Sequence, residues 1–301
     1  MNTAFRVGIV ATLVMVFGIS ASTKGGVGGV HPHGCSQHLS APFGGRAASS
    51  FAPEAVTSES AESVEINLQP EVFDSFDGPA GAAPNPEKWT VVEGAGWDRG
   101  IQTYTTDNAV LDGQGNLLLR ADKTDAGYTS GRVETRYKSN FGYGTLIARI
   151  KMPSGIGLWP QFWLLGVGED PNPWPSAGEI DVVEMVSDPR KWYSSIHGPI
   201  TGVEDYLQNQ FSGEGPDLSE GFHDYWVIHS ENKITVGMDD VIWGIFTPDT
   251  LPPTAEWVYN RPFCAILSLA VGGDWAGPPD SSTNFPAVML VDYLHWAPAT
   301  T

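Results

Sequence analysis

Three acidic residues lie within six consecutive positions of one apolar segment: Glu179, Asp181 and Glu184, spaced as Glu-x-Asp-x-x-Glu. The residues between them are isoleucine and valine, which favour a buried β-strand. Because side chains alternate along a regular strand, Glu179 and Asp181 share one face and Glu184 points to the other. One extra residue at Val182 or Val183, accommodated as a β-bulge, would bring Glu184 onto the face of the other two. The spacing therefore predicts a bulged strand with three carboxylates on one side.

Carboxylates held this close repel one another, so at least one of them has a raised pKa. Hydrolysis of a glycosidic bond needs such a set, because one carboxylate attacks the sugar while a protonated carboxylic acid protonates the leaving oxygen. Asp181, between the other two, would hydrogen-bond the attacking carboxylate. An acidic edge strand or a calcium-binding site has a similar pattern of residues. Calcium, however, prefers flexible loops that mix carboxylates with carbonyls, and the interleaved isoleucine and valine argue against such a loop.

The elements that must position these acids are short. Runs with β-strand character, separated by Gly, Pro, Asn and Asp, begin near residue 65 and continue to residue 298. In residues 144–152, Leu146, Ala148 and Ile150 alternate with mostly polar neighbours, which predicts a half-buried strand. Many short strands and almost no helix predict an all-β fold over residues 65–298, a two-sheet β-sandwich of the jelly-roll kind.

The first part of the chain has a different composition. Arg6 precedes an apolar run over residues 7–19 and small residues follow, so residues 1–21 are predicted to be a signal peptide and the protein to be secreted. The run is shorter than the roughly 20 residues that span a bilayer. Residues 22–64, rich in Gly, Ser, Ala and Pro, are predicted to be a flexible linker. Whether Cys35 and Cys264 pair is left open; Cys264 lies in an apolar run and is expected to be buried.

The charge balance restricts the partners. The chain has 35 acidic and 16 basic residues, a formal net charge of -19. A field of this sign repels phosphate backbones and anionic lipids, so we expect neither nucleic acid nor a membrane surface as partner, and sulfated polysaccharides are disfavoured. Eleven tryptophans are more than the core of such a domain needs, which leaves indole surface for a flat neutral ligand.

Two neighbouring segments carry a family resemblance. Residues 159–165 (WPQFWLL) and 174–184 (WPSAGEIDVVE) closely resemble the signature of glycoside hydrolase family 16, and Glu-x-Asp-x-x-Glu is similar to its laminarinase-like branch. The resemblance extends from residues 73–78 to 291–293. It implies a jelly roll with a concave substrate cleft. It also implies that Glu179 is the nucleophile, Asp181 the assisting carboxylate and Glu184 the acid/base.

The same resemblance implies a set of sugar-binding positions. The matching residues in this chain are Asn108, Arg132, Trp159, Trp163, Trp174, His197 and Trp275. A pyranose ring packs its apolar C–H face on indole, while Asn, Arg and His bind hydroxyl groups. Asp292 matches a position where family members bind structural Ca²⁺, and catalysis itself requires no cofactor. The chain departs from the pattern at Ser268, where laminarinase-like members usually carry Asn.

These observations predict a secreted retaining endo-β-glucanase that hydrolyses β-1,3- or mixed β-1,3-1,4-glucan by double displacement, and that acts as a monomer on a neutral β-glucan. Two alternatives stay open. The bulged acid motif also occurs in enzymes that cut galactans such as agarose, and some relatives in the family bind β-glucan without cleaving it. Because relatives of the second kind have usually lost the acids, the presence of all three favours an enzyme.

Overall fold

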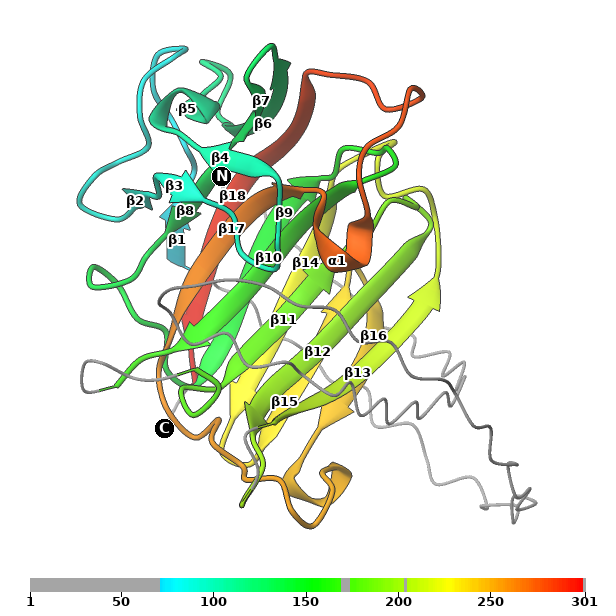
Figure 1. Cartoon of the computed structure of the whole chain (residues 1–301). Helices are drawn as coiled ribbons and strands as arrows, with labels where there is room; N and C mark the ends of the chain where they lie inside the picture. Colours follow the sequence, from blue (N-terminus) through cyan, green and yellow to red (C-terminus); the bar gives the residue numbers. More distant parts are fainter. Residues whose placement is uncertain (1–70, 169–173, 203–204, 300–301) are drawn as a thin grey trace, which may run out of the picture.

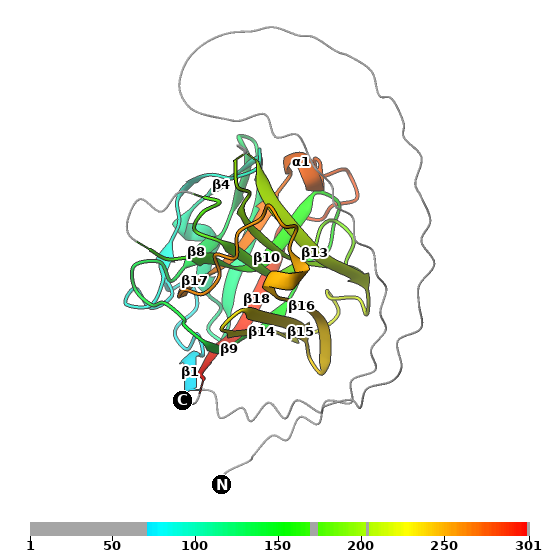
Figure 2. The same ribbon diagram turned by 90° about the horizontal axis from the view of Figure 1, so that it is seen from below.

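The computed structural model describes residues 71–168, 174–202 and 205–299, and these form two stacked β-sheets (Figures 1 and 2). The predicted signal peptide, the predicted linker and Cys35 lie outside the described residues, so those expectations stay predictions. Cys264 is fully buried, as expected. The two-sheet β-sandwich predicted from the strand pattern is confirmed, and its architecture is that of a jelly roll.

One sheet has eleven strands, and residues 144–152, predicted to form a strand, lie near its middle. Nine of its strands follow one another in the order β16 (Val241–Phe246), β15 (Lys233–Met238), β14 (His223–Ser230), β9 (Gly144–Lys151), β18 (Ala287–Pro298), β6 (Leu117–Thr124), β7 (Gly127–Ser130), β4 (Gln102–Tyr104) and β3 (Gly94–Ala95). The other two strands pair outside this order: β1 (Glu71–Asp74) with β18, and β5 (Ala109–Leu111) with β6.

The other sheet has seven strands and holds the acidic segment in its middle. Its order is β13 (Tyr206–Glu214), β12 (Lys191–Pro199), β11 (Glu179–Glu184), β10 (Leu158–Gly166), β17 (Phe263–Val271), β8 (Arg132–Glu134) and β2 (Thr90–Val91). In Figure 1, β11, β12 and β13 lie in front of β14, β15 and β16.

Helical structure in the described part of the chain is limited to single turns: η1 (Thr106–Asn108), η2 (Pro248–Thr250) and α1 (Gly273–Ala276). None of these helices is long and apolar enough to cross a membrane.

The core lies between the sheets. Apolar side chains from both sheets form one buried cluster; it includes Phe162, Ile180, Val183 and Leu267 from the seven-stranded sheet and Leu146, Ile150, Val227 and Val291 from the eleven-stranded sheet. A second, small cluster contains Trp159, Ala270 and Ala276. Because side chains alternate, Trp159 lies on the face of β10 opposite to Phe162. The seven-stranded sheet therefore buries side chains on both of its faces.

Candidate active site

A β-bulge in β11 sets the direction of the three acids. Phe162 of β10 lies opposite Val183. The next residue, Trp163, lies opposite Asp181, so Val182 has no partner on β10. The pairing of β11 with β12 shifts in the same interval. The bulge predicted at Val182 or Val183 is therefore confirmed, and the third acid is turned toward the first two. We call the side of the seven-stranded sheet that carries the three acids the acid face.

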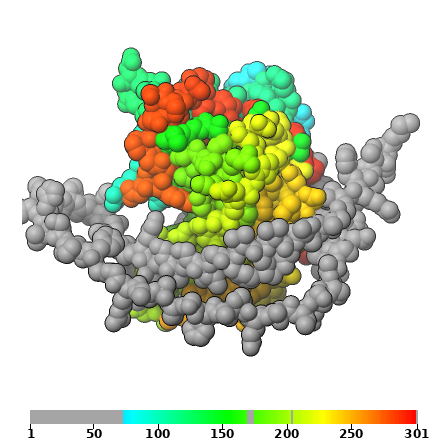
Figure 3. Space-filling model, turned by 90° about the vertical axis from the view of Figure 1, so that its right-hand side faces the viewer, coloured from blue at the N-terminus to red at the C-terminus, as the bar shows by residue number. Residues whose placement is uncertain are grey.

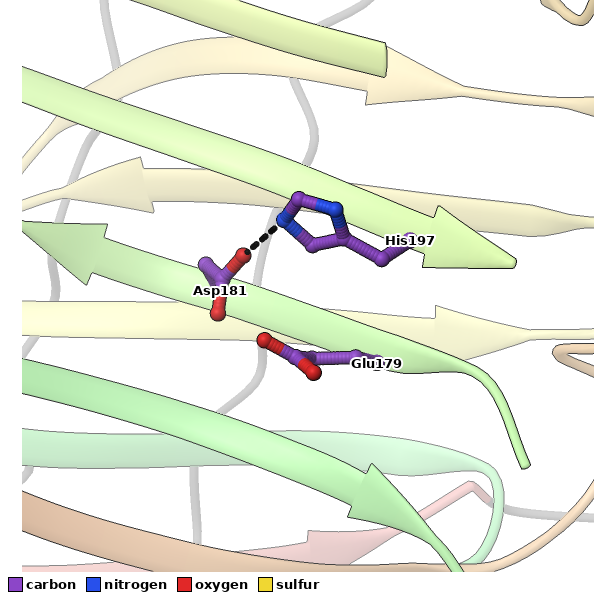
Figure 4. A group of neighbouring side chains, drawn as sticks. All are labelled: Glu179, Asp181 and His197. Carbon is purple, nitrogen blue, oxygen red and sulfur yellow. Dashed lines mark ion pairs between the residues drawn. The ribbon is translucent and has the colours of Figure 1, made fainter. Parts of the chain in front are cut away.

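Two of the acids form a tight group with a histidine. Glu179 and Asp181 project from β11 and His197 from the neighbouring β12 (Figure 4). His197 Nε2 lies 3.0 Å from Asp181 Oδ2. One ligand-type atom from each of the three residues lies within 4.8 Å of the other two. The carboxyl groups of Glu179 and Asp181 lie side by side in this group.

Burial raises the pKa of all three acids, and the charge of Asp181 adds to the rise at Glu179 and Glu184. Burial, reinforced by the charge of Asp181, raises the pKa of Glu179 to about 8. Burial raises the pKa of Asp181 to about 7. Burial and the charge of Asp181 hold the pKa of Glu184 well above its usual range. The three groups therefore carry fewer than three negative charges near neutral pH, which confirms the predicted raised pKa and fits acid catalysis in this region of pH.

The outer two acids have different hydrogen-bond donors. Glu184 Oε1 accepts from Trp159 Nε1 at 3.0 Å and from Gln161 Nε2 at 3.2 Å. Glu179 Oε2 accepts from Trp174 Nε1 at 2.7 Å. Glu184 is only 4% exposed, whereas Glu179 is partly exposed. The two carboxyl groups thus sit in different environments, as a pair with different chemical roles requires.

Aromatic rings surround the acids on the acid face. The rings of Trp159 and Trp275 lie 5.3 Å apart, and Trp275 contacts Tyr193 at 4.7 Å. Trp174, which is 47% exposed, contacts Tyr206 at 4.7 Å. The orange atoms on the left of the space-filling view include the segment around α1 (Figure 3). These rings offer apolar faces beside the acids, which suits the C–H face of a sugar.

Arg132 and Trp163 form a second pair on the same sheet. The guanidinium carbon of Arg132 lies 4.9 Å from the centroid of the Trp163 ring. Arg132 is 6% exposed and forms an ion pair with Glu134 at 3.2 Å. Trp163 Nε1 donates a hydrogen bond to Ser268 Oγ at 3.1 Å. The structure thus brings Arg132 and Trp163 together, with Arg132 largely covered by protein.

The site and the fold match known proteins. Residues 98–293 match the model of a family described as "Glycosyl hydrolases family 16". The chain belongs to this family. The family resemblance stated from the sequence is therefore confirmed, and the protein is a glycoside hydrolase.

Three relatives illustrate the match to family 16. A β-glucanase of Rhodothermus marinus is 33% identical over 240 residues, which cover 73% of this chain and 82% of that protein. The laminarinase catalytic domain of Thermotoga maritima has a TM-score of 0.69 and 31% identity, and the match covers 78% of this chain and all of that one. The endo-β-1,3-glucanase of Pyrococcus furiosus has a TM-score of 0.66 and 34% identity, with 75% of this chain and 94% of that one covered.

One residue predicted to bind sugar, Asn108, instead has its side chain hydrogen-bonded to other residues of the protein. Asn108 is 2% exposed, and its amide donates to Arg120 O at 2.7 Å and to Asp122 at 2.8 Å. Its side-chain oxygen accepts from the Thr105 hydroxyl at 2.6 Å. A sugar hydroxyl would have to replace one of these bonds. The structure therefore groups the other predicted residues around the acids or their strands, but gives Asn108 contacts of a structural kind.

The predicted calcium ligand has a cation beside it already. Arg149 Nε lies 3.2 Å from Asp292 Oδ2, and Arg149 also pairs with Asp224 at 3.4 Å. A guanidinium at this distance opposes a second cation, so these residues do not fit a Ca²⁺ site. Among residues 71–168, 174–202 and 205–299, the one group of three metal-ligating side chains is that of Glu179, Asp181 and His197. The structure therefore does not support the expectation for Asp292.

Four further residues of this family-16 site were not predicted. Gln161, Tyr193 and Tyr206 contact the acids or the rings named above. The sequence does indicate Gln161, because it lies two residues from both Trp159 and Trp163 and therefore on the same face of β10. Asp98, in the loop between β3 and β4, has no such indication in the sequence. Asp98 is exposed to solvent on one side. Partial burial and the charge of Asp274 raise the pKa of its carboxyl group, and the charge of His197 opposes that rise.

The Asp98 loop is fixed to the α1 loop at the edge of the acid face. Asp98 O accepts from Asp274 N at 3.2 Å, and Arg99 Nη1 lies 3.3 Å from Asp274 Oδ1. Gly100 and Gly272 form a β-bridge beside these contacts. The cause of the loop's position is therefore tertiary contact with a segment far away in the sequence.

Proposed function

We propose that this family-16 hydrolase is a secreted, retaining endo-β-glucanase that cuts β-1,3-linked or mixed β-1,3-1,4-linked glucan. The observation that carries the proposal is the bulge at Val182, which turns Glu184 to the same side as Glu179 and Asp181. The similar proteins named above are a β-glucanase, a laminarinase catalytic domain and an endo-β-1,3-glucanase, and they support β-glucan as the substrate class.

In the first chemical step, Glu179 attacks the anomeric carbon while Glu184 protonates the glycosidic oxygen and the sugar–oxygen bond breaks. The environments support these roles. The N–H of Trp174 and the charge of His197 oppose part of the rise that burial and Asp181 cause in the pKa of Glu179, and both contacts stabilise the ionised form that attacks the sugar. Burial of Glu184 favours the protonated form that an acid needs. In the second step, Glu184 takes a proton from water, which attacks the glycosyl-enzyme and releases Glu179.

A neutral polysaccharide suits the charges around this site. The net charge of -19, together with the acidic character of the site, opposes the binding of an anionic chain. The exposed indole of Trp174 and the partly exposed ring of Trp275 offer surfaces for neutral pyranose rings. These features favour glucans over sulfated galactans such as carrageenan.

The proposal is tested with a panel of laminarin, lichenan, agarose and carrageenan, whose products are followed by mass and by reducing ends. We expect oligosaccharides of several lengths from laminarin or lichenan early in the reaction. Proton NMR should show the β-anomer as the first product. Cleavage of agarose alone, or binding of laminarin without new reducing ends, would overturn the substrate or the activity, and a first-formed α-anomer would overturn retention.

Two variants complete this test. Glu179→Ala should abolish turnover and leave the fold intact, while Glu231→Ala, at an exposed turn of the other sheet, should leave the rate unchanged. Full activity in Glu179→Ala would refute the assigned nucleophile. Secretion is tested separately, by expressing the full chain in an export-competent host and determining the N-terminus of the protein in the medium; retention of uncleaved protein inside the cell would contradict it.

A further inference from the structure

We propose that Gln161 is a positioning residue for Glu184, and that a one-way chain of hydrogen bonds from Trp163 through Ser268 fixes the orientation of its amide. The inference rests on the proposed function, because it assumes that Glu184 is the acid/base. It concerns residues for which the family resemblance gave no role. Gln161 was not among the predicted site residues, and Ser268 is a position at which this chain departs from the usual pattern.

Strand register places the three polar residues in one row across the sheet. Gln161 of β10 lies directly opposite Ser268 of β17 on one side. On the other side it lies directly opposite Glu184 of β11. Ser268 Oγ lies 2.9 Å from Gln161 Oε1, and Gln161 Nε2 lies 3.2 Å from Glu184 Oε1. Gln161 therefore connects Ser268 to the acid/base across three neighbouring strands.

The direction of this chain follows from the chemistry of its first member. The indole N–H of Trp163 is a donor only, so Ser268 Oγ, 3.1 Å away, must accept from it. The hydroxyl proton of Ser268 is then free to be donated to Gln161 Oε1. With Oε1 facing the Ser268 hydroxyl, the amide NH₂ of Gln161 is directed toward Glu184. Trp163 is itself held by the guanidinium of Arg132 at 4.9 Å from its ring.

The result at Glu184 is an asymmetric carboxyl group. Its Oε1 accepts two N–H donors, one from Gln161 and one from Trp159. In a protonated carboxyl group the carbonyl oxygen is the better acceptor, so the proton is placed on Oε2. Ser268 is 1% exposed and Glu184 4% exposed, so water competes little for these bonds. Gln161 thereby selects the oxygen from which the proton is transferred.

The test compares two substrates that differ in their need for the acid. A glucan leaving group must be protonated, whereas a 2,4-dinitrophenolate leaves without a proton. Gln161→Met keeps the volume of the side chain and removes the amide. We expect it to lower kcat/KM for the glucan about tenfold and for a dinitrophenyl β-glucoside at most about twofold. Because the Gln161 donor stabilises ionised Glu184, its loss should also move the alkaline limb of kcat/KM to higher pH.

Ser268→Ala tests the chain itself. It should lower kcat/KM for the glucan by about threefold, since Gln161 keeps its contact but loses its anchor. The double variant should be no worse than Gln161→Met alone, because Ser268 acts through Gln161. Gln114→Met, in an exposed turn, is the matched control, and thermal unfolding confirms that each variant is folded.

Equal losses on both substrates, additive losses in the double variant or an unmoved alkaline limb would overturn the inference and assign Gln161 to packing or binding. Wild-type protein that cleaves neither β-glucan nor the aryl glucoside would instead overturn the proposed function. The two failures are therefore distinguishable.

Discussion

His197 Nε2 lies 3.0 Å from Asp181 Oδ2, so the middle acid of the bulged strand is the one that pairs with an imidazole. This contact joins β11 to β12 at the point where three acids crowd together. The charge of His197 also opposes the rise in the pKa values of Glu179 and Glu184 on either side. The contact between His197 and Asp181 therefore offsets part of the repulsion among the three carboxylates.

The raised pKa of Glu179 makes stability depend on pH. Its pKa rises from 4.5 to about 8, so between these values the folded protein binds a proton that the unfolded chain releases. The free energy of unfolding therefore falls as pH rises through this window. Glu179→Gln removes the effect, and above pH 8 it should stabilise the protein by up to about 5 kcal/mol relative to wild type, the equivalent of this shift in pKa.

The measurement is thermal or urea unfolding of both proteins across the window, with Glu231→Gln as the exposed control. Near pH 4.5 the difference between wild type and Glu179→Gln should vanish. A constant difference at every pH would show that the substitution acts through packing and not through the buried charge.

Trp174→Phe separates the two roles of this indole. Phenylalanine keeps an aromatic ring but has no N–H to donate to Glu179 Oε2. Because that donor lowers the pKa of Glu179, its loss should shift the acid limb of kcat/KM to higher pH by about half a unit to one unit.

The matched control is Trp257→Phe, whose indole donates to Asn260 in a loop between η2 and β17. It should leave the acid limb in place. If Trp174→Phe changes KM alone, with an unmoved pH profile, the indole serves only as a sugar platform.

Deleting Val182 tests the bulge. The deletion turns the segment into a regular strand in which Asp181 and Glu184 keep their partners on β10 and all three acids share a face. We expect a folded protein with reduced but measurable activity. The lost apolar burial should reduce the free energy of unfolding by about 1–3 kcal/mol.

Deleting Ile180 is the control, since it removes a residue from the regular part of β11 and turns Glu179 toward the core. That protein should be inactive. Equal activity of the two deletions, measured by reducing ends from the preferred glucan, would contradict the role given to the bulge.

Calcium should not act through Asp292. Because Arg149 occupies the position beside this carboxylate, any change of Tm on adding CaCl₂ should be the same for wild type and Asp292→Asn. Asp240→Asn, at an exposed turn, serves as the control for removing a charge. A Ca²⁺-dependent rise in Tm that is lost only in Asp292→Asn would restore the predicted site.

The sequence predicted those features that depend on local pattern. The alternation at Leu146, Ala148 and Ile150 placed a strand correctly, and all three residues are buried. The spacing of the three acids located the bulge, because apolar neighbours and three carboxylates are compatible only if the strand has one extra residue.

The sequence did not predict features that depend on long-range contact. Asn108 has the residue type of a sugar ligand, but its amide is used by Arg120 and Asp122 of β6, the strand that pairs with the segment directly after it. Asp98 lies in a loop whose place is fixed by the α1 segment, and nothing in its local sequence indicates the acids nearby. Asp292 matched a pattern whose chemistry Arg149, on another strand, has changed.

The edge of the acid face at Arg99 and Asp274 is built from residues 175 positions apart. On the ribosome, the first of these segments emerges long before the second exists. β1 and β8, which are synthesised early, therefore remain unpaired with these partners until β18 and β17 have been synthesised. Enzymatic activity should consequently appear only after β18 has left the exit tunnel, and a chain truncated before β17 should accumulate as an aggregation-prone intermediate.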